Sequence, residues 1–183
     1  METRKIGSLN VSVVGLGCNN FGWRIDPEAT AAVVDAALEA GVNFFDTADV
    51  YGKGQSEEFL GRALRLRRDE ALIATKFGLE MDKQRQGAKP HYIRQAAEES
   101  LRRLGTDRID LYQLHKPDPE TPIADTLGAL GALVRAGKVR EIGCSNFSVE
   151  QFREAARAAG DNAIGWRLTD DELAEIDQIT SGT

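Results

Sequence analysis

Four ionisable side chains lie at or just beyond the carboxyl ends of three strand-like segments, and their types suit proton transfer. Asp46, Lys76 and His115 each end a short apolar run, and Tyr51 follows Asp46 in DTADVYG. A lysine ammonium stabilises the phenolate that remains after a nearby tyrosine gives up its proton. An aspartate beside the lysine would keep it charged and fixed, and a histidine would orient a carbonyl oxygen or relay the proton. The four types together therefore predict protonation of a carbonyl oxygen.

Each of these residues also has a structural alternative. Lys76 and Asp46 alone would be read as an ion pair, Tyr51 as a surface loop residue, and His115 as a satisfied strand-end histidine. Their occurrence in this order, all at strand ends, favours one shared site. Since no side chain donates hydride, a reduction at this site would need a nicotinamide cofactor.

The elements that must position these residues alternate strictly between strand and helix. The strand-like segments cover residues 11–17, 42–46, 71–76, 110–115 and 139–145, and the last of them ends in Ser145-Asn146. Helices are expected over 27–41, 57–66, 90–104, 122–136 and 148–159, with one more starting near Thr169. Such alternation predicts a parallel sheet with right-handed crossovers. The carboxyl ends of parallel strands share one face, so the polar residues should meet there.

Several start signals fix where helices should begin. Asp26 with Pro27, and Ser56 ahead of two glutamates, are typical N-terminal caps, and Ser148 with Gln151 forms a capping box. Other polar residues carry only structural interpretations: His91 as an exposed helix start, Asp49 as a solvated loop acid, the arginines of LRLRR (64–68) as a solvated helix end, and 81–90 as an exposed loop.

Composition excludes several classes of function. The 183 residues have a formal net charge of −6, with 42% hydrophobic residues, as in a globular protein of one domain over 1–183. The acidic balance argues against nucleic acid and anionic membranes as partners. No apolar run approaches the roughly 18 residues of a membrane span, and METRKIGSLN lacks the apolar core of a signal peptide. Cys18 and Cys144 fit neither a disulfide framework nor a metal site, so a cytoplasmic setting is expected.

The combined motifs resemble the aldo-keto reductase superfamily. The matching stretches are GLGCNNFG, NFFDTADVYG, LIATKFG, DRIDLYQLHKPD, GKVREIGCSNFS and GWRLTDDELAEID, in family order from about residue 3 to residue 180. The resemblance implies an NAD(P)H-dependent oxidoreductase that reduces aldehydes or ketones, with NADPH as the usual donor. It implies that Asp46, Tyr51, Lys76 and His115 are catalytic, with Tyr51 the proton donor, and that Ser145 and Asn146 bind the nicotinamide carboxamide. It also places Asp46 near the cofactor ribose, and Trp23 with His115 in the substrate pocket.

The chain departs from the family in its length. A closed (β/α)₈ barrel typically takes about 250 residues, and AARAAG (155–160) runs almost directly into GWRLTDDELAEID. We therefore expect an incomplete barrel of the TIM type: five parallel strands with helices, a C-terminal helix, and an internal loss between about 160 and 165. Because the family's phosphate and adenine anchors lie in the missing part, cofactor affinity should fall, and neither the substrate nor a choice between NADPH and NADH can be read.

Two further hypotheses remain at this stage. A truncated barrel could act without catalysis as a self-association or interaction module, since unpaired strand edges invite pairing with a second copy. Alternatively, Lys76 could form a Schiff base with a carbonyl substrate. Asp46 argues against that chemistry, because pairing keeps the amine protonated.

Overall fold

A parallel sheet of five strands organises the chain. The computed structural model describes residues 1–160. The strand order is β3-β4-β5-β6-β7, and each neighbouring pair is parallel. The strands are β3 (Gly15–Gly17), β4 (Phe44–Asp46), β5 (Leu72–Phe77), β6 (Ile109–Leu114) and β7 (Val139–Cys144). Sequential neighbours thus pair throughout, as in a barrel opened between its first and fifth strands.

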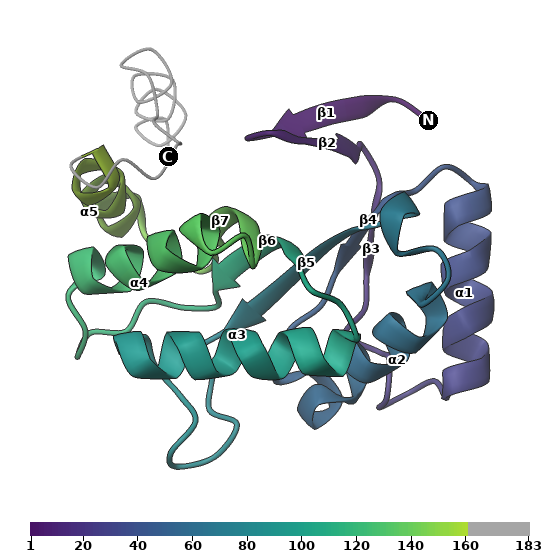
Figure 1. Ribbon diagram of the computed structural model, residues 1–183, viewed down its shortest axis with the longest axis horizontal. Coiled ribbons are helices and arrows are strands. Elements are labelled where there is room, and N and C mark those ends of the chain that lie inside the picture. The colour runs from purple at the N-terminus through teal and green to yellow at the C-terminus, as the bar shows by residue number, and fades with distance from the viewer. Residues whose placement is uncertain (161–183) are drawn as a thin grey trace.

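Helices follow the strands and cover one side of the sheet (Figure 1). They are α1 (Pro27–Glu39), α2 (Gln55–Leu64), α3 (Pro90–Leu104), α4 (Ile123–Arg135) and α5 (Val149–Gly160), with short 3-10 turns η1 (Tyr51–Gly54) and η2 (Arg68–Glu70). The main core lies between helices and sheet, where Phe45, Ile73 and Tyr112 pack among Leu60 and Ile93. The expected α/β fold with five strand–helix units is confirmed within residues 1–160.

The expected single strand over 11–17 is wrong. Residues Leu9–Ser12 form β2, which pairs antiparallel with β1 (Thr3–Ile6), and only β3 joins the parallel sheet. Val13 and Val14 between them are 48% and 53% exposed. The sequence shows one continuous apolar run, but its first part belongs to β2 and packs outside the parallel sheet. Leu9 and Val11 form a second small core with Ala74 and Leu111.

Most predicted helix ends are confirmed. The Asp26 side chain accepts a hydrogen bond from the Ala29 N–H at 2.8 Å, and Ser148 and Gln151 exchange the two bonds of a capping box. The predicted Ser56 cap is wrong, since Gly54 occupies the cap position of α2. The buried Ser56 hydroxyl donates instead to the Cys18 carbonyl at 2.7 Å. The final helix expected near Thr169 lies outside the described residues.

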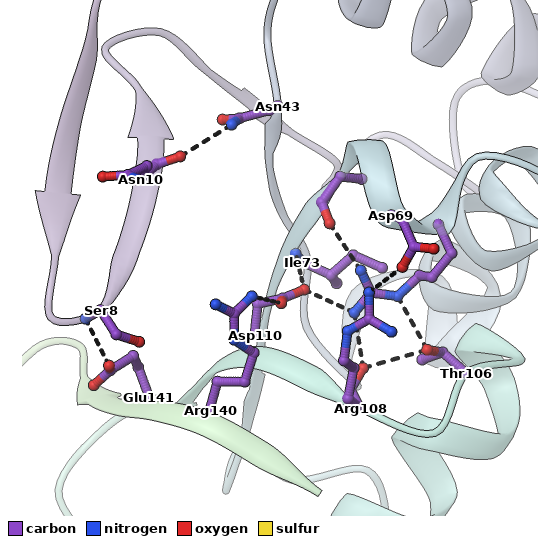
Figure 2. A network of polar contacts seen from close by, with 12 residues as sticks. Ser8, Asn10, Asn43, Asp69, Ile73, Thr106, Arg108, Asp110, Arg140 and Glu141 are labelled. Atoms are coloured by element: carbon purple, nitrogen blue, oxygen red, sulfur yellow. Dashed lines mark hydrogen bonds and ion pairs between the residues drawn. The ribbon is translucent and has the colours of Figure 1, made fainter. Parts of the chain in front are cut away.

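A network of ion pairs joins the amino ends of β6 and β7 to η2 (Figure 2). Asp110 accepts hydrogen bonds from the Arg68 and Arg140 guanidinium groups at 2.7 and 2.9 Å and from the Ile73 N–H at 3.0 Å. Arg68 is therefore not part of a solvated helix end, because its guanidinium reaches a buried carboxylate. At the turn between β1 and β2, the Ser8 N–H donates to the Glu141 carboxylate of β7 at 2.7 Å (Figure 2).

Candidate active site

The strand register brings three of the predicted residues to one face of the sheet. Asp46 pairs with Ala74, two residues before Lys76, and Lys76 pairs with Gln113, two residues before His115. Because side chains alternate between faces along a strand, Asp46, Lys76 and His115 point to the same side at the carboxyl ends of β4, β5 and β6. That side is opposite to the one on which Phe45, Ile73 and Tyr112 pack against the helices.

Lys76 is the most constrained member of this group. Its Nζ donates to Asp46 Oδ2 at 2.6 Å and to the Thr47 carbonyl oxygen at 2.9 Å. The lysine side chain is 8% exposed and the aspartate side chain 36%. Desolvating an ammonium is costly unless it is paired and hydrogen-bonded, and both conditions are met here. The backbone contact of Thr47 was missed by sequence reasoning, since a carbonyl acceptor leaves no mark in residue type.

Tyr51 begins η1 and lies against the lysine and the histidine. The Lys76 Nζ is 5.3 Å from the centre of the Tyr51 ring. The Tyr51 and His115 rings meet edge to face, with centroids 5.8 Å apart and planes at 83°. The Tyr51 N–H donates to the Ala48 carbonyl at 3.2 Å, which folds residues 48–51 into a tight turn. The four predicted side chains therefore come together in one cluster.

His115 is buried, and its charged form is disfavoured. Burial and the neighbouring Lys76 ammonium lower the pKa of His115 below its ordinary value, and Asp46 opposes this only in part. Its buried Nδ1 has no hydrogen-bond partner within residues 1–160. The imidazole is therefore neutral near pH 7, so it offers one N–H donor and one bare nitrogen.

Ser145 and Asn146 follow β7 beside the histidine. The Ser145 N–H donates to the Leu114 carbonyl at 2.9 Å. Asn146 has a φ of 59°, a left-handed conformation that asparagine adopts more readily than most residues. Its Nδ2 donates to the His115 carbonyl at 2.8 Å and to Ser145 Oγ at 3.1 Å. The two residues are thus held against the strand that carries His115.

Trp23 lies in the segment between β3 and α1. It is 68% exposed, and the Arg24 guanidinium stacks over its ring at 4.5 Å. The same segment contacts the Tyr51 turn, because a Cβ added to Gly52 would lie 3.1 Å from the Phe21 carbonyl oxygen. The segment that carries Trp23 therefore touches the Tyr51 turn, and the Trp23 side chain is largely free of packing by residues 1–160.

Asp49 is not the solvated loop acid that the sequence suggested. It is only 2% exposed, and burial together with the Glu57 carboxylate raises its pKa to about 7. Its sequence context, between Ala48 and Val50 in a short loop, gave no sign of the helix residues that cover it. His91 is exposed, as expected.

The fold and the cluster define a class of protein: a barrel-type α/β chain whose ionisable side chains meet at the carboxyl ends of parallel strands, where such folds build their sites. The aldo/keto reductase family model matches residues 13–167. The chain therefore belongs to the aldo/keto reductase family. No helix within residues 1–160 is both long and apolar enough to cross a membrane.

Named relatives agree with this assignment. The chain is 42% identical over 165 residues to the aldo-keto reductase yakc of Schizosaccharomyces pombe, whose name specifies NADP(+), and 41% identical over 152 residues to the aldo-keto reductase YhdN of Bacillus subtilis. These matches cover 85% and 79% of this chain but 48% and 46% of the relatives. The chain thus spans about half the length of the curated relatives it matches.

A solved structure shows the same relationship. The chain superposes with a TM-score of 0.79 and 38% identity on the aldo-keto reductase AKR11C1 from Bacillus halodurans in its holo form, covering 86% of this chain and 54% of that one. The parallel strands described here therefore form an incomplete barrel.

Proposed function

We propose that the chain reduces aldehyde or ketone carbonyls to alcohols with NAD(P)H, and that Tyr51 is the proton donor. The observation that carries the proposal is the placement of the Lys76 ammonium, 2.6 Å from Asp46 Oδ2 and 5.3 Å from the Tyr51 ring centre. A fixed positive charge beside a phenol favours loss of its proton to an acceptor. Asp46 keeps that charge in place.

The residues after β7 fit a nicotinamide carboxamide. Both hydrogens of Asn146 Nδ2 are used in its bonds to His115 and Ser145, so the side chain offers Oδ1 as an acceptor. The Ser145 oxygen accepts one of those bonds, which leaves its hydroxyl hydrogen as a donor. A carboxamide carries one donor group and one acceptor, so the pair is complementary to it. Asp46, 36% exposed on its side chain, adds an acceptor for a ribose hydroxyl.

Each side chain has a defined task in this proposal. A bound nicotinamide supplies the hydride that no side chain can. Tyr51 gives its phenolic proton to the carbonyl oxygen, and Lys76 stabilises the phenolate that remains. The neutral His115 donates one N–H to the same oxygen and so orients it against Tyr51. The exposed Trp23 ring forms one apolar wall for the substrate.

The NADP(+) in the name of the Schizosaccharomyces pombe relative supports NADPH as the cofactor. We also propose that the domain, 1–183, has lost an internal segment between about 160 and 165. The family match that continues to residue 167 in a chain half as long as its relatives supports this. Cofactor binding is then weaker than in a full barrel.

Two unpaired cysteines support a cytoplasmic location.

Fluorescence titration with NADPH, followed by single-turnover reduction of an aromatic aldehyde, tests this function. The expected result is saturable binding, with Tyr51→Phe lowering the reduction rate by about 10²–10⁴-fold. Binding should be unchanged in that variant, because the phenol is assigned to the proton and not to the cofactor. A folded protein that binds no NADPH at millimolar concentrations would sink the proposal.

One observation favours a second candidate, a non-catalytic self-association module. Within residues 1–160, β7 pairs only with β6, and an apolar cavity of about 330 Å³ opens beside it between Leu130, Ile142 and Phe147. A second copy adding a strand at this edge would cover both. Analytical ultracentrifugation separates the cases, since a monomer of 20.0 kDa at all concentrations speaks against self-association.

A further inference from the structure

Asp49 is buried two residues before Tyr51 and has no part in the proton transfer described above. Its side chain is covered on the helix side of the sheet, and its Oδ1 has no hydrogen-bond partner within residues 1–160. A buried carboxyl oxygen without a partner costs free energy, and more so when charged. Such a group needs an explanation in terms of what surrounds it and what it holds.

Two carboxylates, Glu57 and Glu99, and one guanidinium, Arg103, act on the Asp49 carboxyl. Arg85 also approaches Glu99, at 3.4 Å, and offsets part of its charge. On α2, the fully buried Glu57 binds Arg103 Nε and the Thr75 hydroxyl, each at 2.6 Å. On α3, Arg103 also approaches Glu99 at 3.5 Å, so its one positive charge already serves two carboxylates. The charges of Glu57 and Glu99 raise the pKa of Asp49, and Arg103 opposes them.

Two buried phenols complete this environment. Tyr92 on α3 and Tyr112 on β6 both have their pKa raised by burial first and by the charge of Asp49 second. The Tyr112 hydroxyl, like Asp49 Oδ1, has no partner within residues 1–160. No cation other than Arg103 acts on Asp49 among the groups that shift its pKa.

The backbone of the same residue connects directly to the candidate active site. The Asp49 N–H donates to the Lys76 carbonyl at 3.0 Å, and the Lys76 Nζ binds the preceding Thr47 carbonyl at 2.9 Å. The Tyr51 N–H closes the turn on the Ala48 carbonyl at 3.2 Å. The turn that carries Tyr51 is therefore anchored to Lys76 through the backbone of Asp49, and the Asp49 carboxyl is buried beneath it.

We propose that Asp49 is a positioning residue for Tyr51: its buried carboxyl must be uncharged for the turn 48–51 to stay in register with Lys76, and its ionisation loosens that turn. The inference rests on the proposed function for its catalytic meaning but concerns a different group. The carboxylate form is repelled by Glu57 and leaves a charged oxygen buried without a partner, so the turn must shift to relieve it. The uncharged form avoids both the repulsion and the burial of a charge, and these outweigh the one backbone N–H, that of Val50, which favours the carboxylate.

The direction of the pH effect follows from linkage. The pKa of Asp49 is about 7 in the folded chain against 3.8 for an ordinary aspartate. The stabilising contribution of this group is thus complete below about 3.8 and is lost as the pH rises through 7. Alignment of Tyr51 should follow the same course and decline between pH 6 and pH 8.

The experiment compares wild type with Asp49→Asn, which resembles the uncharged carboxyl at every pH. Two readouts are taken between pH 5 and 8.5: the single-turnover rate, and the ¹³Cζ signal of Tyr51. That signal is one of three tyrosine signals and is assigned by its loss in Tyr51→Phe. In the wild type, both readouts should show a step near pH 7, with the rate falling about tenfold as misalignment sets in. Asp49→Asn should keep the low-pH rate and lose both steps.

Control variants keep each outcome decisive. Glu58→Gln removes an exposed carboxylate from α2, the helix that also carries Glu57, and should leave the pH step in place. Glu57→Gln removes the repelling charge and should move the step to lower pH, which tests the inference even where Asp49→Asn fails to fold. A step near pH 7 that persists in Asp49→Asn, or that Glu57→Gln does not move, overturns the inference. If the protein reduces no carbonyl, the proposed function fails. The pH dependence of the Tyr51 ¹³Cζ signal then tests the role of Asp49 by itself.

Discussion

The two ends of the ion pair between Asp46 and Lys76 differ in their access to water. Oδ2 of Asp46 lies 2.6 Å from Nζ of Lys76, and the lysine side chain is 8% exposed where the aspartate side chain is 36% exposed. A charge left alone by mutation is tolerated where water can reach it and is costly where water cannot. The pair joins neighbouring strands β4 and β5, so its loss also affects the sheet.

We expect Asp46→Asn to destabilise the chain more than Lys76→Met. The first variant leaves a buried ammonium with a neutral partner and should lower the free energy of unfolding by about 1–3 kcal/mol. The second leaves a carboxylate that water can reach and should cost less. Urea unfolding at pH 7 measures both, with the exposed Lys83→Met as control. Equal losses in the two variants would contradict this reading of the pair.

The titration of His115 should be shifted to low pH. Burial first and the Lys76 charge second lower the pKa of His115 below 6.5. The unfolded chain therefore takes up this proton more readily than the folded chain does, so stability is complete above pH 6.5 and declines as the pH falls. Proton NMR of the imidazole follows it directly, and His91→Gln removes the only other histidine signal. A midpoint above 6.5 would show that Asp46 outweighs burial and Lys76.

Asp110 should be essential for stability although it lies at the amino end of β6, away from the candidate site at the carboxyl end of that strand. Its side chain is 1% exposed and binds Arg68 at 2.7 Å and Arg140 at 2.9 Å. Asp110→Asn removes the charge between two guanidinium groups and should lower the free energy of unfolding by about 3 kcal/mol.

A matched control lies three residues earlier, just before β6. Asp107 is 91% exposed and lies 3.8 Å from Arg108, so Asp107→Asn should change stability by less than about 0.5 kcal/mol. Thermal unfolding of the two variants separates the roles of a buried and an exposed aspartate. Similar transition temperatures for both would show that the Asp110 network contributes little.

The N-terminal hairpin should stabilise the sheet through Leu9. This side chain is fully buried and forms a small core with Val11, Ala74 and Leu111. Leu9→Ala should cost about 2–5 kcal/mol, as in other buried leucine truncations. Ile6→Ala, in the same hairpin but 38% exposed, serves as the control. A loss no greater than that of the control would mean that the hairpin is not packed on the sheet in solution.

Local pattern predicted the elements that are regular over several residues. The runs that end in Lys76, His115 and Ser145 each became a strand, and the polar residues gathered at one edge because parallel strands share their direction. The caps at Asp26 and Ser148 were readable because capping depends on residues only three positions apart.

Features that depend on distant partners were not readable. The apolar run 11–17 is shared between two sheets, and only the pairing partners show where it divides. Asp49 looked solvated because its cover, Glu57 with Arg103, comes from two helices that a local window does not contain. Arg68 lies in a basic helix end and still reaches Asp110, 42 residues later.

Some contacts of the hairpin span most of the described chain. Ser8 binds Glu141, 133 residues later, and Leu9 packs beside Leu111. β1 and β2 precede both of these partners in the chain, so the two contacts cannot form until β6 and β7 have been made. Closing so long a loop carries an entropic cost that earlier contacts must already have reduced. The bonds of the hairpin to Asn43 can form early, whereas its contacts with β6 and β7 can form only after most of the described chain has been made.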